Sequence, residues 1–229
     1  MNLKIGMLLF PSLTQLDLTG PFEVFCRMTD ADVLLLWKTL EPVISDSGMA
    51  ILPTATLAAC PALDVVFVPG GPGQVPLMED EEVLEFLRQQ AAGARYVTSV
   101  CTGSLVLAAA GLLQGYRAAC HWMSREWLAE LGVEVSSERF VIDRNRVTGG
   151  GVTAGIDFAL QLTALLRGEM EAKRIQLQIE YNPAPPFDAG SPESAGPDLE
   201  NALRQRAKPL QESRRAVVAR VKRRLSVEN

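Results

Sequence analysis

The sequence predicts an α/β fold in which helices cover both faces of a mainly parallel β-sheet. Patterns typical of strands alternate with patterns typical of helices along most of the 229 residues. The strand patterns are almost uninterrupted apolar runs, as expected for strands that are buried on both faces. Ligands bind such sheets at the carboxyl ends of the strands, so the segments that follow the strands are the candidate site.

In the first half of the chain, prolines and glycines mark the ends of the expected elements. Pro11 ends a strand and opens a loop, and Gly20 and Pro21 then begin a helix, because proline is tolerated where a helix leaves its N–H unpaired. Gly93 ends a helix that starts with acidic residues. The expected elements are strands at 3–10, 32–38 and 63–68, a hairpin within 42–53, and helices from 20 and at 79–92.

In the second half, a β-branched strand at 96–100 is followed by a run of helix formers at 105–110, which Gly111 ends. Residues 182–197 are rich in Pro, Gly, Ser and Ala and predict an irregular strap over the surface. The last helix contains Pro209, a candidate break. The other expected elements are a strand within 116–122, a hairpin at 140–147, and helices at 124–131, 153–167, 169–181 and 198–225.

Cys101 occupies the most suggestive position in the sequence. Only residues 101–103 join the strand at 96–100 to the helix at 105–110, so the cysteine lies on a tight, strained elbow at a helix N-terminus. Unpaired N–H groups at that end favour the thiolate, which is the nucleophilic form of cysteine. The alternative is a small apolar residue buried at the end of a strand, the commoner role of a free cysteine.

Three further segments, at 15–21, 69–73 and 148–155, follow strands and so belong to the same edge of the sheet. Asp17 is either a helix cap or an acid that lies beside the cysteine. In the second case, burial of the carboxyl group would raise the pKa of Asp17 into the range of proton transfer at neutral pH. The glycines of the other two segments permit tight turns, and their amides could face a developing negative charge. The amide of Thr102 suits the same task, while its hydroxyl either caps the helix or lies beside the nucleophile.

The remaining candidates are weaker. His121 is the single histidine, and its spacing from Cys101 does not decide between a Cys–His dyad and a structural role. Cys26, Cys60 and Cys120 show neither the clustering of metal ligands nor a disulfide framework, and we interpret them as small apolar residues. No metal site is expected.

Composition and charge narrow the class of protein. Hydrophobic residues make up 48% and charged residues 21%, and no apolar run approaches the roughly 18 residues that span a bilayer. The apolar start lacks the features of a signal peptide, so we expect a cytoplasmic protein without a membrane segment. The net charge is −5, yet residues 200–229 carry nine Lys or Arg and three acids. We expect this basic tail to lie on the acidic body or on a second subunit rather than on nucleic acid.

Six motifs together resemble the ThiJ/PfpI superfamily over residues 3 to about 190. They are Asp-Leu-Thr-Gly-Pro at 17–21, Pro-Gly-Gly at 69–71, Val-Cys-Thr-Gly-Ser at 100–104, Ala-Gly-Leu-Leu-Gln-Gly at 110–115, His-Trp at 121–122, and Thr-Gly-Gly-Gly-Val-Thr-Ala-Gly-Ile-Asp at 148–157. Within that superfamily the chain most resembles the isocyanide hydratases, whose strap and basic helical tail resemble residues 181–192 and the C-terminus.

The resemblance implies a flavodoxin-like three-layer sandwich with a nucleophile elbow, a homodimer, and no metal or organic cofactor. It implies a catalytic domain at residues 1–190, and a Pro-rich strap and basic helix at 191–229 that pack on the body or on the dimer partner. The implied reaction adds water to an isocyanide, R–N≡C, through a covalent thioimidate on Cys101, and gives an N-substituted formamide.

The same resemblance assigns the site residues. Asp17 would relay the proton and guide water, and Thr102 would hydrogen-bond Asp17 or the attacking water. The expected substrate pocket is lined by backbone amides of Gly71, Thr102 and Gly150, together with Val152.

Three alternatives stay open. Ligand-sensing domains of AraC-type regulators share the elbow, but the segment after Tyr181 is short for a helix-turn-helix domain of roughly a hundred residues. A glyoxalase or deglycase acting on reactive carbonyls needs the same cysteine and acid, and fold analogy does not exclude it. A redox sensor would oxidise Cys101 to the sulfinic acid. A protease is disfavoured, because the peptidase-like members carry histidine at the position of Thr102.

Overall fold

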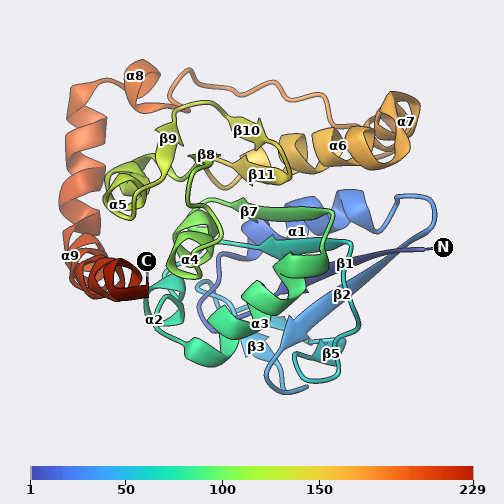
Figure 1. Cartoon of the computed structure of the whole chain (residues 1–229). Coiled ribbons are helices and arrows are strands. Elements are labelled where there is room, and N and C mark those ends of the chain that lie inside the picture. Colours follow the sequence, from blue (N-terminus) through green and yellow to red (C-terminus); the bar gives the residue numbers. More distant parts are fainter. Residues whose placement is uncertain (1, 229) are drawn as a thin grey trace.

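A seven-stranded sheet forms the centre of the molecule, in a computed structural model that describes residues 2–228 (Figure 1). The strand order is β10-β11-β7-β6-β1-β2-β5, and every neighbouring pair is parallel except β10 and β11. The strands are β1 (Leu3–Leu8), β2 (Ala31–Trp37), β5 (Ala55–Thr56), β6 (Val65–Val68), β7 (Tyr96–Val100), β10 (Phe140–Asp143) and β11 (Arg146–Gly149). The predicted mainly parallel sheet is confirmed.

Helices cover both faces of this sheet. On one face α1 packs against α6, which is followed by α7, and on the other face α3 packs against α4 (Figure 1). The bounds are α1 (Gln15–Phe25), α3 (Glu81–Gly93), α4 (Gly103–Ala109), α6 (Ala154–Arg167) and α7 (Glu169–Gln178). The layers are therefore helix, sheet and helix, a flavodoxin-like arrangement.

Three phenylalanines show how one face is packed. Phe25 of α1, Phe67 of β6 and Phe158 of α6 are fully buried, and their ring centroids lie 5.8 to 6.5 Å apart. Aromatic rings at such distances add to the free energy gained by burying their area. This cluster fixes α1, and with it Asp17, to the centre of the sheet.

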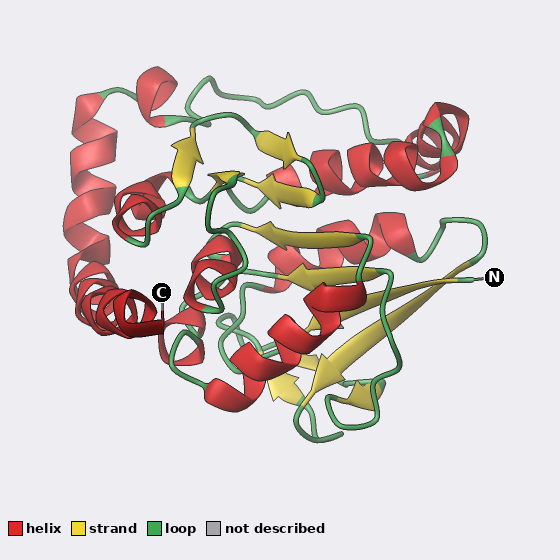
Figure 2. Cartoon of the chain, viewed as in Figure 1, coloured by secondary structure: helices red, strands yellow, loops and turns green. Residues whose placement is uncertain are grey.

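The smaller elements lie around the central sheet (Figure 2). Two strands form the predicted hairpin at residues 42–53, and β8 pairs with β9 in a short parallel ribbon. These elements are β3 (Val43–Ile44), β4 (Ala50–Ile51), α2 (Gln74–Leu77), β8 (Arg117–Ala119), the 3-10 turn at Trp122–Ser124, α5 (Arg125–Glu130), β9 (Glu134–Ser136) and α8 (Pro192–Ala195). The short elements α2, α8, β5 and β9 were not predicted, since two to four residues carry little periodicity.

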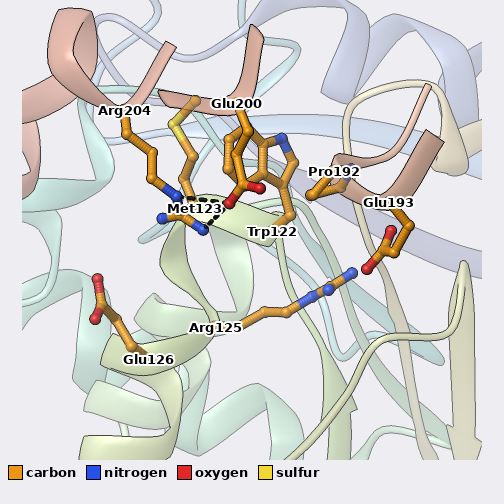
Figure 3. A pocket seen from close by; sticks show the side chains of 8 residues that line it. All are labelled: Trp122, Met123, Arg125, Glu126, Pro192, Glu193, Glu200 and Arg204. Atoms are coloured by element: carbon orange, nitrogen blue, oxygen red, sulfur yellow. Dashed lines mark hydrogen bonds and ion pairs between the residues drawn. The ribbon is translucent and has the colours of Figure 1, made fainter. Parts of the chain in front are cut away.

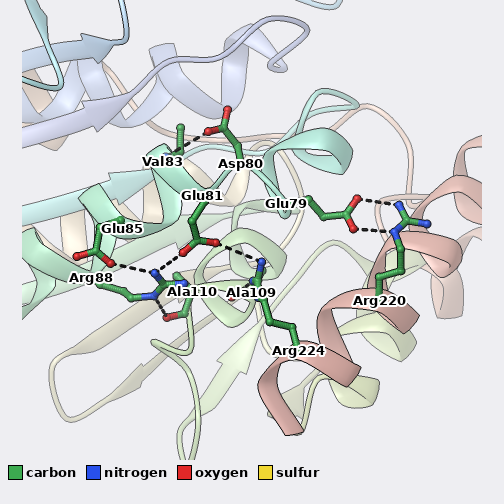
Figure 4. A network of polar contacts seen from close by, with 10 residues as sticks. All are labelled: Glu79, Asp80, Glu81, Val83, Glu85, Arg88, Ala109, Ala110, Arg220 and Arg224. Atoms are coloured by element: carbon green, nitrogen blue, oxygen red, sulfur yellow. Dashed lines mark hydrogen bonds and ion pairs between the residues drawn. The ribbon is translucent and has the colours of Figure 1, made fainter. Parts of the chain in front are cut away.

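The C-terminal helix α9 (Pro197–Glu228) lies on the body of its own chain, against α2, α4, α5 and α8. It stays helical through Pro209 and changes direction along its length (Figure 1). Arg220 makes a two-pronged ion pair with Glu79 at 2.7 Å for each contact, and Arg224 donates to the carbonyl of Ala109 at 2.7 Å (Figure 4). Arginines of the basic tail thus contact Glu79, just before α3, and Glu81, the first residue of α3.

The expected start of the first helix is wrong. The first helix begins at Gln15 rather than at Gly20, so Asp17 lies in its first turn and Pro21 lies inside it. Pro21 removes one backbone hydrogen bond of the helix. Burial of Leu18, Val24 and Phe25 along the same helix offsets that loss.

None of the helices in the described part of the chain combines the length and the hydrophobicity that crossing a membrane requires.

Candidate active site

Cys101 lies on a strained elbow between β7 and α4. Its φ angle is +58°, a left-handed conformation that costs energy for any residue with a side chain. Its backbone N–H donates to the carbonyls of Gly149 (3.1 Å) and Gly150 (2.8 Å), which fixes the turn from the neighbouring strand β11. The predicted nucleophile elbow is confirmed.

The loop after β6 packs so closely on the elbow that residue 70 must be glycine. A Cβ atom on Gly70 would lie 2.6 Å from the amide nitrogen of Thr102, 2.7 Å from Oδ2 of Asp17 and 2.8 Å from Cβ of Cys101. Three segments that are distant in sequence therefore converge on one point at the carboxyl edge of the sheet, as predicted.

Asp17 is fully buried at this point. Its Oδ2 accepts a hydrogen bond from the backbone N–H of Gly70 at 3.0 Å, while Oδ1 has no hydrogen-bond partner among the described residues. Burial raises the pKa of Asp17 to about 7, although hydrogen bonds from Cys101 and Gly70 act in the opposite direction. The carboxyl group can therefore take up and release a proton near neutral pH.

The electrostatics of Cys101 differ from the expectation. Burial, followed by the nearby charge of Asp17, raises the pKa of the Cys101 thiol well above that of an ordinary cysteine. The backbone N–H of Thr102 lowers this pKa but does not compensate. Burial and the charge of Asp17 both favour the neutral thiol of Cys101, beside an acid that can accept its proton, whereas the N-terminus of α4 favours the thiolate that the elbow suggested.

Thr102 holds the elbow to the loop after β6. Its hydroxyl oxygen accepts a hydrogen bond from the N–H of Gly71 at 3.0 Å and donates to the carbonyl of the same residue at 3.4 Å. The N–H of Gly150 donates to the carbonyl of Arg139 at 2.8 Å. The N–H groups of Gly71 and Gly150, which were expected to line the pocket, therefore already have hydrogen-bond partners inside the protein.

Cys101 lines a cavity of about 220 Å³. Gly71, Thr102, His121 and Val152 line it, whereas Gly150 lines a neighbouring cleft. Cys101 is only 6% exposed, so a ligand reaches the sulfur through this cavity. Its outer wall comes from α9, through Ala207, Leu210, Gln211 and Arg214.

These α9 residues were not predicted from the sequence. Their spacing of three, four and seven places them on one face of a helix, which was a readable signal. Nothing in the sequence shows that this face covers the elbow.

His121 reaches the cavity but does not form a dyad with Cys101. Its Nδ1 accepts a hydrogen bond from the N–H of Met123 at 3.3 Å, so the ring proton belongs on Nε2. Burial, together with the charges of Arg214 and Arg125, lowers the pKa of His121 to about 4. The neutral ring therefore presents an N–H donor and not a base.

A larger cleft of about 430 Å³ lies beside the site, between residues 122–126 and the start of α9 (Figure 3). The guanidinium of Arg204 stacks over Trp122, 4.8 Å from the ring centroid, and pairs with Glu200. This cleft does not include Cys101 or Asp17. Within residues 2–228, no three His, Cys, Asp or Glu side chains gather in a way that would hold a metal ion.

A cysteine on a strained strand-to-helix elbow, beside a buried acid with a pKa near neutrality, defines a nucleophilic-cysteine site on a flavodoxin-like fold. Residues 3–165 match the DJ-1/PfpI family, and the chain belongs to that family.

Similar proteins extend over the rest of the chain. An isonitrile hydratase of Pseudomonas putida is 53% identical over 99% of this chain and 100% of its own length. A crystal structure of a ThiJ/PfpI family protein from Pseudomonas syringae covers 95% of this chain and 91% of its own, with 44% identity and a TM-score of 0.92. The transcriptional regulator GbdR of Pseudomonas aeruginosa is 37% identical over 78% of this chain, but only over half of its own length.

Proposed function

We propose that this protein adds water to isocyanides and releases N-substituted formamides, with Cys101 as the nucleophile. The observation that carries the proposal is the pairing of a strained cysteine, which lines a small cavity, with a buried Asp17 whose pKa is about 7. The full-length similarity to an isonitrile hydratase supports it. A cavity of about 150 Å³ can hold benzene, so a volume of about 220 Å³ suits an isocyanide with one ring or a short chain.

The first half of the reaction forms a covalent intermediate. Ionised Asp17 takes the proton of the Cys101 thiol, and the sulfur attacks the terminal carbon of the isocyanide. Protonated Asp17 then delivers the same proton to that carbon. The product is a thioimidate, R–N=CH–S–Cys101, and Asp17 is ionised again.

The second half releases the formamide. Asp17 accepts a proton from water as the water oxygen attacks the thioimidate carbon, and it then delivers this proton to the nitrogen, which gives the tetrahedral intermediate R–NH–CH(OH)–S–Cys101. Asp17 next takes the hydroxyl proton as the carbonyl forms and the carbon–sulfur bond breaks, and it passes this proton to the departing sulfur, so that Cys101 is a thiol again. The sum is R–N≡C plus water giving R–NH–CHO, and Asp17 passes one proton in each of three steps and ends ionised.

Thr102 acts in this scheme as a positioning residue. Its hydrogen bonds with Gly71 hold the elbow to the loop after β6. In the same loop, the backbone N–H of the preceding residue, Gly70, donates to Asp17. The distance between the sulfur and the carboxyl group depends on this connection. Gly71 and Val152 shape the pocket wall.

The test is to mix the purified protein with an aryl isocyanide and to measure the formamide by chromatography. We expect turnover by the natural chain and by Cys26→Ala, whose cysteine is exposed, and none by Cys101→Ala. Mass spectrometry of an Asp17→Asn variant should show no covalent adduct, because Asp17 takes the thiol proton before the sulfur attacks. Formamide production by Cys101→Ala would remove the mechanism, and lactate formed from methylglyoxal in a parallel assay would favour the glyoxalase alternative.

We extend the proposal to a homodimer in the reducing cytoplasm. Met170 and Leu177 are seven residues apart on α7, so they share a helix face, and they are 78% and 82% exposed. All four cysteines are free, as a reducing compartment requires. Light scattering should give twice the chain mass of 24.9 kDa, and a monomer would refute the assembly without affecting the chemistry.

A further inference from the structure

Arg214 is a buried cation without a counter-charge at the wall of the Cys101 cavity. It is 5% exposed, and none of the hydrogen bonds or ion pairs found among the described residues involves its guanidinium; its Nε is fully buried without an acceptor. Elsewhere on α9 the chain supplies partners, since Arg204 pairs with Glu200 and Arg220 pairs with Glu79. Burying an unpaired guanidinium is costly, so its retention at the site indicates a ligand.

Gln211 and His121, which both carry N–H donors, line the same cavity. Gln211 accepts a hydrogen bond from the indole N–H of Trp127 at 2.6 Å through Oε1, which fixes the amide, while its Nε2 is buried without an acceptor. The neutral His121 holds its proton on Nε2. The carboxylate among the lining residues, Asp46, is exposed and already accepts the hydroxyl proton of Thr14 at 2.7 Å.

This wall of the cavity is therefore rich in donors and poor in acceptors. None of the ion pairs found among the described residues balances the charge of Arg214, and burial favours the neutral form of the Cys101 thiol. A planar, charged acceptor that fits a guanidinium fork in a small space is a carboxylate.

We propose that the substrates are isocyanides that carry a carboxylate, which Arg214 binds with Gln211 as a second donor while the isocyanide carbon meets Cys101. This inference rests on the proposed function and adds a substrate class to it. It also explains why α9 lies over the elbow, because Arg214 and Gln211 both lie on the face of α9 that lines the cavity.

The experiment compares 4-isocyanobenzoate with its methyl ester, which has the same ring and isocyanide but no charge. We expect the natural chain to prefer the acid in kcat/KM, and Arg214→Gln to reduce the acid-to-ester ratio by about 10- to 100-fold, the usual range for losing a charged hydrogen bond. Arg214→Lys keeps the charge without the fork and should reduce the ratio less. Arg220→Gln, on the same helix but outside the cavity, is the matched control and should leave the ratio unchanged.

Binding can also be measured without turnover. Calorimetry would give the affinities of 4-formamidobenzoate and of its methyl ester for the Cys101→Ala variant and for the double variant that also carries Arg214→Gln. A preference for the acid that disappears in the double variant supports the proposal. Equal losses for acid and ester in Arg214→Gln would mean that Arg214 serves the Cys101 sulfur, and would overturn it. Hydration of the ester but not of the acid by the natural chain would also overturn it while the proposed function stands; hydration of neither would refute the proposed function itself.

Discussion

Replacing Asp17 with asparagine should inactivate the protein and, at neutral pH, make it more stable. Asp17 is an acid whose folded-state pKa is raised from 3.8 to about 7 by burial. Such a group contributes its full share to the free energy of unfolding at a pH below its pKa in the unfolded chain. This contribution is lost as the pH rises through the pKa of the group in the folded protein. Asparagine carries no charge at any of these pH values and should not show this loss.

The size of the effect follows from the shift. At pH 7.5, ionised Asp17 destabilises the fold by about 4 kcal/mol, and at pH 4.5 by only about 1 kcal/mol. The asparagine amide nitrogen would take the place of Oδ1, which has no partner among the described residues, and an unpaired buried donor costs about 1–3 kcal/mol. That cost does not depend on pH, so the difference of about 3 kcal/mol between the two pH values should survive.

The assay is urea unfolding of the natural chain and of Asp17→Asn at pH 4.5 and 7.5, with Asp188→Asn in the exposed strap as control. The stability of Asp17→Asn relative to the natural chain should rise between these pH values, while that of the control should stay constant. Equal relative stabilities of Asp17→Asn at both pH values would show that the pKa of Asp17 is not raised, and the proton relay would lose its basis.

Three further outcomes test the site. Because ionised Asp17 accepts the thiol proton, kcat/KM for an aryl isocyanide should fall about tenfold per pH unit below pH 7, and a flat profile from pH 5 to 8 would contradict this. Gly70→Ala, whose Cβ would meet three site atoms within 2.8 Å, should lose about 1–3 kcal/mol of stability together with activity, whereas Gly93→Ala, with open space around it, should not. Thr102→Val leaves the N–H of Gly71 unpaired and should cost about 1–3 kcal/mol by denaturant unfolding, while Thr102→Ser should keep most of that stability.

Local patterns explain what could be predicted. The strand β7, the joint at Cys101 and the helix α4 follow one another within 14 residues, so the β-branched run, the helix formers and Gly111 place the elbow without knowledge of the rest of the chain. The start of α1 was missed because Pro21 resembles a helix start. Packing of Leu18 and Phe25 on the sheet overrides that local preference.

The chemistry of Cys101 shows the limit of local reasoning. Its position at a helix N-terminus favoured a thiolate, but burial and the charge of Asp17 outweigh that contribution. The hydrogen bond from the N–H of Gly150 to the carbonyl of Arg139 could not be predicted either, because it depends on how the loop before β10 folds back.

The amino-acid sequence by itself determined the order of strands and helices, the elbow at Cys101, and the gathering of Asp17, Gly71 and Thr102 at one edge of the sheet. Periodicity, turn residues and the geometry of parallel sheets suffice for these features. Only the tertiary structure decided that Asp17 is fully buried and that one face of α9 closes the cavity with Arg214. Burial and closure arise from contacts between residues that lie far apart in the sequence, such as Asp17 with Gly70 and Cys101 with Arg214, and no local pattern encodes how much water those contacts exclude.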